Sequence, residues 1–403
     1  MKPRLLVLNQ YYWPGLEATA HLLAELCEAL ADDFEVMVVT GRLRSFPDLP
    51  HRESHNGVEI VRVESTVYDR ASLWRRGANY LTYLLQALRI GLAVPRADVV
   101  LCMTDPPMIG DVALAVARRQ RAPLVVISQD VFPEIAVELK RLTNPFLVGL
   151  LRVLVGIYLR RADRVVAIGE TMRERLIAKG APANRVHVIP NWIDTSRLAP
   201  LEHANEWAVE HGLQDAFVVM HSGNVGHAQD LDALVRAATF LRDLDSLRIV
   251  IVGSGARHDE LVALATRLEV DHVQFLDYQP RDRLPESLSA AALHVVGLAR
   301  GLAGYIVPSR LYGILAVGRA VIAAADEHSE TARVVRQVDC GVVVAPGRPE
   351  LLATAIRSAY DGELELDAMG RRGRAYVVAE ADRAVAVGRY RDILLEVVGA
   401  DRR

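Results

Sequence analysis

The sequence has few cysteines. It holds three in 403 residues, Cys27, Cys102 and Cys340, which are far apart and form no CxxC pair. No histidine stands at the spacing that a cysteine and histidine zinc site requires. A disulfide framework and a structural zinc site are therefore excluded, and we expect reduced thiols in a cytoplasmic protein.

The chain also lacks a strong charge of either sign. Its 47 basic and 50 acidic residues leave a net charge of -3, which is typical of an ordinary globular protein and gives no sign of nucleic-acid binding. Residues 1–190 hold 24 basic and 20 acidic residues, net +4, and the remainder is net -7. The basic half is compatible with an anionic membrane surface or a phosphate-bearing acceptor, and equally with chance scatter of arginines.

No apolar run is long enough to cross a bilayer. Residues 5–8, close behind the start of the chain, are too short for the core of a signal peptide and are typical of a first strand, so we expect no export. The most apolar helical stretch, 145–161, is interrupted by Arg152 and falls short of the roughly 20 residues that a membrane span needs.

Two interpretations of the stretch 145–161 differ in what covers it. Apolar residues fall nearly all round the expected helix, which favours a helix buried in a domain core. The alternative is an interfacial helix, with Arg141, Arg152, Arg160 and Arg161 near lipid headgroups.

Short apolar runs alternate with amphipathic stretches along the whole chain, a pattern typical of parallel sheets with helical crossovers. The expected strands form two series, 5–8, 36–40, 99–103, 124–128 and 165–168, then 218–221, 249–252, 273–275, 293–296, 320–323 and 341–344. We therefore predict an α/β protein with two doubly wound parallel sheets and a cleft between them. The periodicity breaks near 190–200, which gives domains of 1–195 and 196–383.

Two glycine-rich loops follow strands of the second domain. In 221–230 (HSGNVGHAQD), Gly223 and Gly226 would let backbone N–H groups approach a phosphate at the start of a helix near Leu231. A tight strand-to-helix turn explains these glycines equally well. In VGSG, Gly253 and Gly255 do not complete GxGxxG, so a hydride-transfer cofactor is disfavoured.

The stretch 305–322 (YIVPSRLYGILAVGRAVI) holds a cation at an unusual place. Pro308 and Ser309 read as a loop end and helix N-cap, so Arg310 would lie in the first turn, where the helix dipole disfavours a positive charge. A diphosphate in front of the helix would explain it, because guanidinium binds phosphate through paired hydrogen bonds. An arginine turned to solvent is the alternative.

The order and spacing of HSGNVG, VGSG and VPSRLYGILAVGRAVI resemble glycosyltransferase family 4, and among its members the bacterial fucosamine-type and colanic-acid-type polysaccharide transferases. The resemblance extends to NQYYWPGLEATA, SQDVFPE and IPNWID and covers nearly the whole chain. It implies a GT-B fold of two Rossmann-like domains facing a cleft, with a C-terminal crossover helix at 384–403. It also implies metal-independent transfer of a sugar with retention of configuration.

The sequence departs from the wider family at the donor site. That family has an arginine and a lysine where this chain has Asn224 and Gln229, and two glutamates where it has Tyr305 and Gly313. We expect Arg310 to supply the missing charge for the leaving diphosphate as a catalytic residue. The donor-binding residues that the resemblance implies are Gly15, Gly223, Asn224, Gly226, Gln229, Gly253, Gly255, Tyr305, Pro308, Ser309, Tyr312 and Glu330.

The second expected catalytic residue is Asp130, which follows the strand 124–128. Its carboxylate would orient or deprotonate the acceptor hydroxyl; capping of the helix after Pro133 is an equal alternative. Glu17 lies just after the glycine loop that holds Gly15. No carboxylate cluster stands out, so we expect neither a metal nor a cofactor.

The resemblance implies a hexosyl- or N-acetylaminosugar transferase of surface polysaccharide synthesis, with a nucleotide-sugar donor and a saccharide acceptor. A lipid-linked acceptor at the inner membrane face, with peripheral membrane contact, extends the same analogy. Two other classes stay open, a sugar-nucleotide epimerase of the same fold and a degenerate protein that binds nucleotide sugars without turnover.

Overall fold

The computed structural model describes residues 2–15, 17–43, 46, 48–66 and 73–401. Contacts within the chain divide it into two compact units. Unit 1 comprises Met1–Pro190 and Ala386–Arg403, and unit 2 comprises Asn191–Val385. The sequence predicts a domain border at residue 195, and in the structure unit 1 ends at Pro190 and unit 2 begins at Asn191. The chain returns to unit 1 at Ala386.

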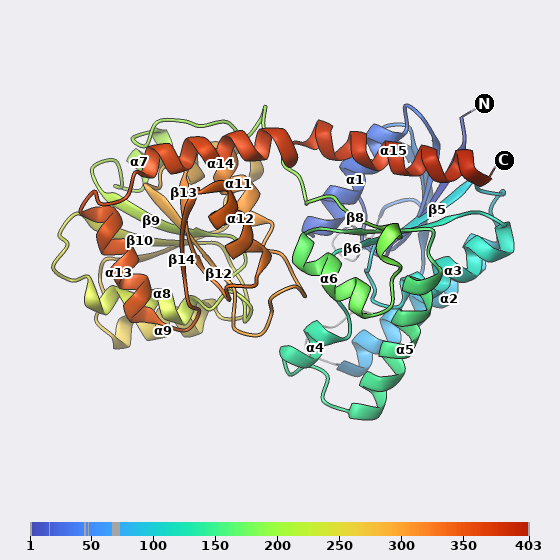
Figure 1. Ribbon diagram of the computed structural model, residues 1–403, viewed down its shortest axis with the longest axis horizontal. Helices are drawn as coiled ribbons and strands as arrows, with labels where there is room; N and C mark the ends of the chain where they lie inside the picture. Colours follow the sequence, from blue (N-terminus) through green and yellow to red (C-terminus); the bar gives the residue numbers. More distant parts are fainter. Residues whose placement is uncertain (1, 16, 44–45, 47, 67–72, 402–403) are drawn as a thin grey trace. The chain divides into compact units, whose positions relative to one another are not determined.

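Unit 1 is built on an eight-stranded sheet in the order β3-β4-β2-β1-β5-β6-β7-β8. Figure 1 labels β5, β6 and β8 of this sheet. All neighbours pair in parallel except the edge strand β3, which runs antiparallel to β4. The strands are β1 (Arg4–Leu8), β2 (Glu35–Gly41), β3 (Arg52–His55), β4 (Val58–Val63), β5 (Val99–Cys102), β6 (Leu124–Ser128), β7 (Arg164–Ala167) and β8 (Val186–Val188). The central strands β5 and β6 are buried throughout, as strands covered on both faces must be.

Helices connect the parallel strands of unit 1. They are α1 (Ala18–Leu30), α2 (Leu73–Ala93), α3 (Ile109–Gln120), α4 (Glu134–Glu138), α5 (Pro145–Arg161), α6 (Glu170–Ala178) and the short η1 (Ala183–Arg185). The C-terminal helix α15 (Arg383–Asp401) follows all the strands, and from Ala386 on it belongs to unit 1. Helix α3 packs against both α2 and α5. A Cβ atom on Gly110 of α3 would lie 2.8 Å from the Tyr158 ring of α5, so this glycine allows the two helices to approach closely.

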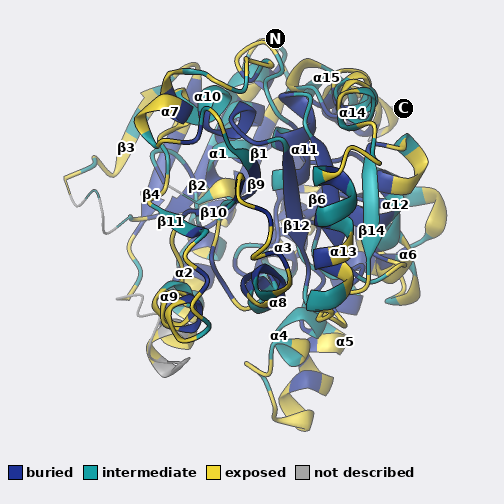
Figure 2. Cartoon of the chain, turned by 90° about the vertical axis from the view of Figure 1, so that its left-hand side faces the viewer, coloured by how far each residue is buried: buried dark blue, intermediate teal, exposed yellow. Residues whose placement is uncertain are grey.

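Helix α5 has the bounds expected from the sequence, but only one of its faces is buried (Figure 2). Val148, Leu151 and Val155 belong to the core. Phe146, however, is 85% exposed. The expectation of a helix buried all round is therefore wrong for the outer face, because no described element covers it.

Unit 2 is built on a six-stranded sheet in the order β11-β10-β9-β12-β13-β14, with parallel pairing throughout. Its strands are β9 (Phe217–Ser222), β10 (Leu247–Val252), β11 (Val273–Leu276), β12 (Leu293–Gly297), β13 (Ala320–Ala324) and β14 (Gly341–Val344). Apolar clusters cover both faces of the sheet. All eleven strands expected from the sequence are present, and the α/β class is confirmed.

The helices of unit 2 follow its strands in turn. They are α7 (Glu206–Glu210), α8 (Leu231–Ala237), η2 (Ala238–Phe240), α9 (His258–Arg267), η3 (Arg281–Arg283), α10 (Leu284–Ser289), α11 (Arg310–Ala316), α12 (Glu330–Val338), α13 (Pro349–Tyr360) and α14 (Leu366–Glu380). Within the described part of the chain, no helix is both long enough and apolar enough to span a bilayer.

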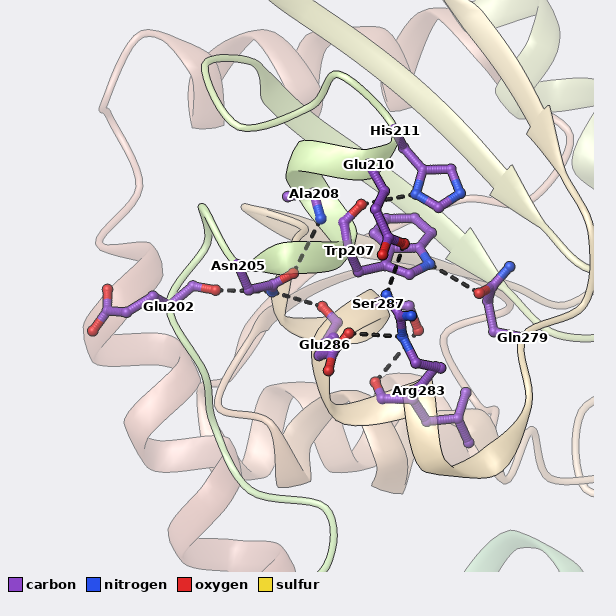
Figure 3. A network of polar contacts seen from close by, with 11 residues as sticks. Glu202, Asn205, Trp207, Ala208, Glu210, His211, Gln279, Arg283, Glu286 and Ser287 are labelled. Atoms are coloured by element: carbon purple, nitrogen blue, oxygen red, sulfur yellow. Dashed lines mark hydrogen bonds and ion pairs between the residues drawn. The ribbon is translucent and has the colours of Figure 1, made fainter.

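A polar network joins α7 to the loop after β11 and to α10 (Figure 3). Asn205 caps α7 by accepting from the Ala208 N–H at 3.1 Å, and its amide group donates to the Glu286 carbonyl at 2.9 Å. The ring of Trp207 is fully buried, and its N–H donates to Gln279 Oε1 at 2.9 Å. The network therefore fixes the loop at the carboxyl end of β11.

Candidate functional site

Two strand-end loops of unit 2 touch through their glycines. Gly253, just after β10, has φ +134°, and a Cβ atom there would lie 2.0 Å from the Gly223 carbonyl oxygen in the loop after β9. A Cβ on Gly255 would lie 2.2 Å from the carbonyl oxygen of Val225. Both contacts are far too short for a side chain, so Gly253 and Gly255 are required for the packing of the two loops.

Gln229 holds the first loop together. Its side chain is 9% exposed, and its Oε1 accepts from the Gly226 N–H at 3.0 Å and from Asn224 Nδ2 at 3.3 Å. The Gly226 N–H is thus used within the loop, while the side chain of Asn224 lies in an exposed position. Gln229 and Gly226, both expected to bind the donor, support the loop in this structure.

Gly223 has an open side that faces Arg310. Its φ of +134° requires glycine, and the nearest atom to an added Cβ is Nε of Arg310 at 4.0 Å. Arg310 is the first residue of α11, and Ser309 occupies the N-cap position without a side-chain capping bond. The structure therefore brings the loop 221–230 and the guanidinium of Arg310 together.

Arg310 contacts a neutral histidine. Its Nη1 lies 3.2 Å from Nδ1 and 3.1 Å from Nε2 of His221, the fully buried residue in β9. Burial, with a contribution from the Arg310 charge, lowers the pKa of His221 well below its usual value. The imidazole is therefore neutral and accepts a hydrogen bond at its unprotonated nitrogen.

The guanidinium of Arg310 has no counter-ion within the described chain. The side chain is half-buried, and burial lowers the pKa of Arg310 to about 10. A shielded cation without an acidic partner is unfavourable, so the site is prepared to bind an anion. This is the main electrostatic feature of the site.

The remaining residues expected around the donor have mixed surroundings. Tyr312 is 2% exposed and belongs to the core cluster beside β12 and β13, and Pro308 is buried. Tyr305 is half-buried, and its N–H donates to the Leu302 carbonyl at 3.1 Å. Glu330, at the start of α12, is 2% exposed and ion-paired with Arg333, so its carboxylate is already engaged.

In unit 1, two aspartates follow neighbouring strands. Asp130 comes after β6, and burial together with the charge of Asp105 raises the pKa of Asp130 to about 7. Asp105 comes after β5, and burial raises its pKa as well. The N-cap residue of α4 is Pro133, with no side-chain capping bond. The alternative role of Asp130 as a helix cap is therefore excluded.

A third carboxylate lies near this pair. Gly15 is buried, its N–H donates to the Tyr12 carbonyl at 2.8 Å, and an added Cβ would lie 2.8 Å from Oε2 of Glu17. The charge of Glu17 contributes to the raised pKa of Asp105. Sequence reasoning missed Asp105, although it follows the expected strand 99–103 just as Asp130 follows 124–128. Among described residues, no group of three or more histidine, cysteine, aspartate or glutamate side chains could hold a metal ion.

Comparison with protein families and relatives agrees with this architecture. Residues 15–192 match the glycosyl transferase 4-like domain, and residues 204–376 match the glycosyl transferases group 1. A protein of Escherichia coli K12, named as the colanic acid biosynthesis glycosyl transferase WcaI, is 32% identical over 205 residues. That match covers 50% of this chain and 50% of WcaI, so the chain spans about half the length of this relative.

Two further similarities cover nearly the whole chain. The glycosyltransferase WbjE of Pseudomonas aeruginosa is 23% identical over 376 residues, which are 91% of each protein. The structure of HepE from Anabaena in complex with UDP has a TM-score of 0.77 and 16% identity, and covers 98% of this chain and 100% of HepE. This structural likeness confirms the GT-B fold of two parallel-sheet α/β domains.

Proposed function

Because the chain belongs to the group 1 glycosyltransferases, with a glycosyl transferase 4-like domain in its first half, we propose that it transfers a sugar from a nucleoside diphosphate to a saccharide acceptor. The observation that carries this proposal is the shielded guanidinium of Arg310. It lies beside the open side of Gly223 and has no counter-ion among the described residues. A diphosphate would supply the missing negative charge.

Arg310 would act on the leaving group. As the bond between the sugar and the diphosphate breaks, negative charge grows on the phosphate oxygen, and a fixed cation stabilises that charge more in the transition state than before it. His221 accepts a hydrogen bond from one N–H of the Arg310 guanidinium and so orients this group. The other N–H groups of the guanidinium remain for the phosphate oxygens. Removing such a group costs on the order of 10²-fold or more in rate.

We propose that transfer retains the anomeric configuration and needs no metal ion. The leaving phosphate would take the proton of the acceptor hydroxyl on the same face of the sugar, and Asp130 would orient that hydroxyl. The pKa of Asp130, raised to about 7, leaves this carboxyl able to exchange a proton near neutral pH. Asp105 supports the raised pKa and joins Asp130 in this role.

The donor and setting are proposed from the relatives. HepE binds UDP, and the name of WcaI refers to colanic acid synthesis, so a UDP-activated hexose or N-acetylaminosugar is the first donor to test. We propose an acceptor saccharide linked to lipid at the cytoplasmic face of the inner membrane, in surface polysaccharide assembly. Peripheral contact with that membrane belongs to the same proposal.

The proposal is tested by incubating the purified protein with UDP-, GDP-, dTDP- and CDP-sugars and lipid-linked saccharide extracts. Release of one nucleoside diphosphate that depends on acceptor, persists with EDTA and falls on the order of 10²-fold in Arg310→Gln supports the proposal. An isomerised donor formed without acceptor would instead identify an epimerase. Donor binding without any release would identify a degenerate binding protein.

A further inference from the structure

Helix α5 presents an apolar stripe to solvent. Phe146 is 85% exposed, Leu150 49% and Val153 57%. Their spacing of i, i+4 and i+7 puts all three on one face of the helix, opposite the face that packs on α3. Exposure of one large apolar side chain is ordinary, but an aligned stripe indicates a surface that another body covers.

A second stripe runs along α2. Leu81 is 57% exposed, Leu85 59% and Leu92 45%, and the spacing of i, i+4 and i+11 again puts them on one helical face. Both α2 and α5 pack on α3, so the two stripes belong to the same helical layer of unit 1. We call these two stripes together the α2–α5 surface.

The two segments that carry the α2–α5 surface have charge of one sign. Residues 75–93 and 140–161 contain no aspartate or glutamate. Arg152 is paired with Glu134 of α4 at 3.1 Å. The other exposed basic residues that accompany the stripes are Arg75, Arg89, Lys140, Arg141, Arg160 and Arg161.

We propose that the α2–α5 surface docks on an anionic lipid bilayer. Apolar stripes flanked by arginine and lysine suit the boundary between headgroups and acyl chains, where apolar side chains enter the bilayer and cations meet lipid phosphates. A second copy of the chain fits poorly, because symmetric pairing of this surface would bring like charges together. The proposal rests on the membrane contact of the proposed function and names the surface that makes it. It uses residues of unit 1 alone, so its test needs no sugar donor.

The test is sedimentation of the full-length protein with vesicles, without any sugar donor. One set is phosphatidylcholine alone, and the other contains phosphatidylglycerol as well. We expect binding to the second set that weakens as salt is raised. The triple variant Phe146→Ser, Leu150→Ser and Val153→Ser should lose on the order of tenfold or more of this binding. The matched control carries Val209→Ser and Phe240→Ser in unit 2, where exposures are 58% and 54%, and should bind like wild type.

Three results would overturn the proposal. Wild-type protein that ignores phosphatidylglycerol vesicles would do so, as would a triple variant that binds as well as wild type. The third is a dimer, seen by analytical ultracentrifugation, that the triple variant abolishes while vesicle binding is absent. Because the substituted side chains are exposed, urea denaturation should give the triple variant the same free energy of unfolding as wild type. Donor binding by the triple variant is measured separately.

Discussion

Replacing Arg310 by glutamine should make the unliganded protein more stable. Burial lowers the pKa of Arg310 to about 10, roughly two pKa units below its ordinary value. Each pKa unit corresponds to about 1.4 kcal/mol, so shielding the charge costs roughly 3 kcal/mol. Solvent screening of a half-buried side chain reduces this figure, and loss of the hydrogen bond to His221 costs about 1 kcal/mol. We therefore expect Arg310→Gln to raise the free energy of unfolding by about 1–2 kcal/mol.

The assay is urea denaturation of wild type, Arg310→Gln and the control Arg357→Gln, each with and without nucleoside diphosphate. Arg357 is an arginine of unit 2 that is ion-paired with Asp243 at the surface, so its replacement should leave the free energy of unfolding nearly unchanged. Ligand should stabilise wild type and the control but not Arg310→Gln. If Arg310→Gln is less stable than wild type without ligand, Arg310 is a structural residue and the reasoning fails.

Three further predictions concern other parts of the chain. Burial raises the pKa of Asp130 to about 7, so the folded protein keeps this proton longer than the unfolded chain and loses stability as pH rises from about 4 to 7. In Asp130→Asn, the free energy of unfolding from urea titrations should fall by roughly 2–4 kcal/mol less over this pH range than in wild type. Parallel profiles of unfolding free energy against pH for the two proteins would contradict this. Gly253→Ala should cost more than about 3 kcal/mol or prevent folding, whereas Gly212→Ala, with φ +66° and open space, should cost about 1–2 kcal/mol by the same assay. Trp207→Phe and Gln279→Ala should each cost about 1–3 kcal/mol, and a double variant whose loss equals the sum of the two would show that their hydrogen bond contributes nothing.

The central parallel strands could be predicted because each is a short apolar run covered on both faces. The hairpin of β3 and β4 was missed, although Asn56-Gly57 stands between the two strands with φ values of +46° and +80°. This dipeptide is the strongest short-range signal for a two-residue hairpin. Strand β8 was missed because its three residues are too few to show a period.

The site was harder to predict than the fold. Arg310 was identified from an unfavourable charge at a helix start, which is a local argument. Its contact with His221, 89 residues away, depends on how α11 meets β9, and no local pattern encodes that. Gly253 and Gly255 are donor-binding residues only by family resemblance, and the contact that demands glycine at both positions, with the backbone of another loop, is invisible in the sequence. The outer face of α5 likewise depends on which elements cover it.

The central claim, that Arg310 binds the leaving diphosphate, is tested most directly by calorimetric titration. UDP, GDP, dTDP and CDP are each compared with the corresponding nucleoside, in wild type and in Arg310→Gln. The account predicts that wild type binds one nucleoside diphosphate at least roughly tenfold more tightly than its nucleoside, and that Arg310→Gln loses this preference. An equal preference for the diphosphate in Arg310→Gln would contradict the account.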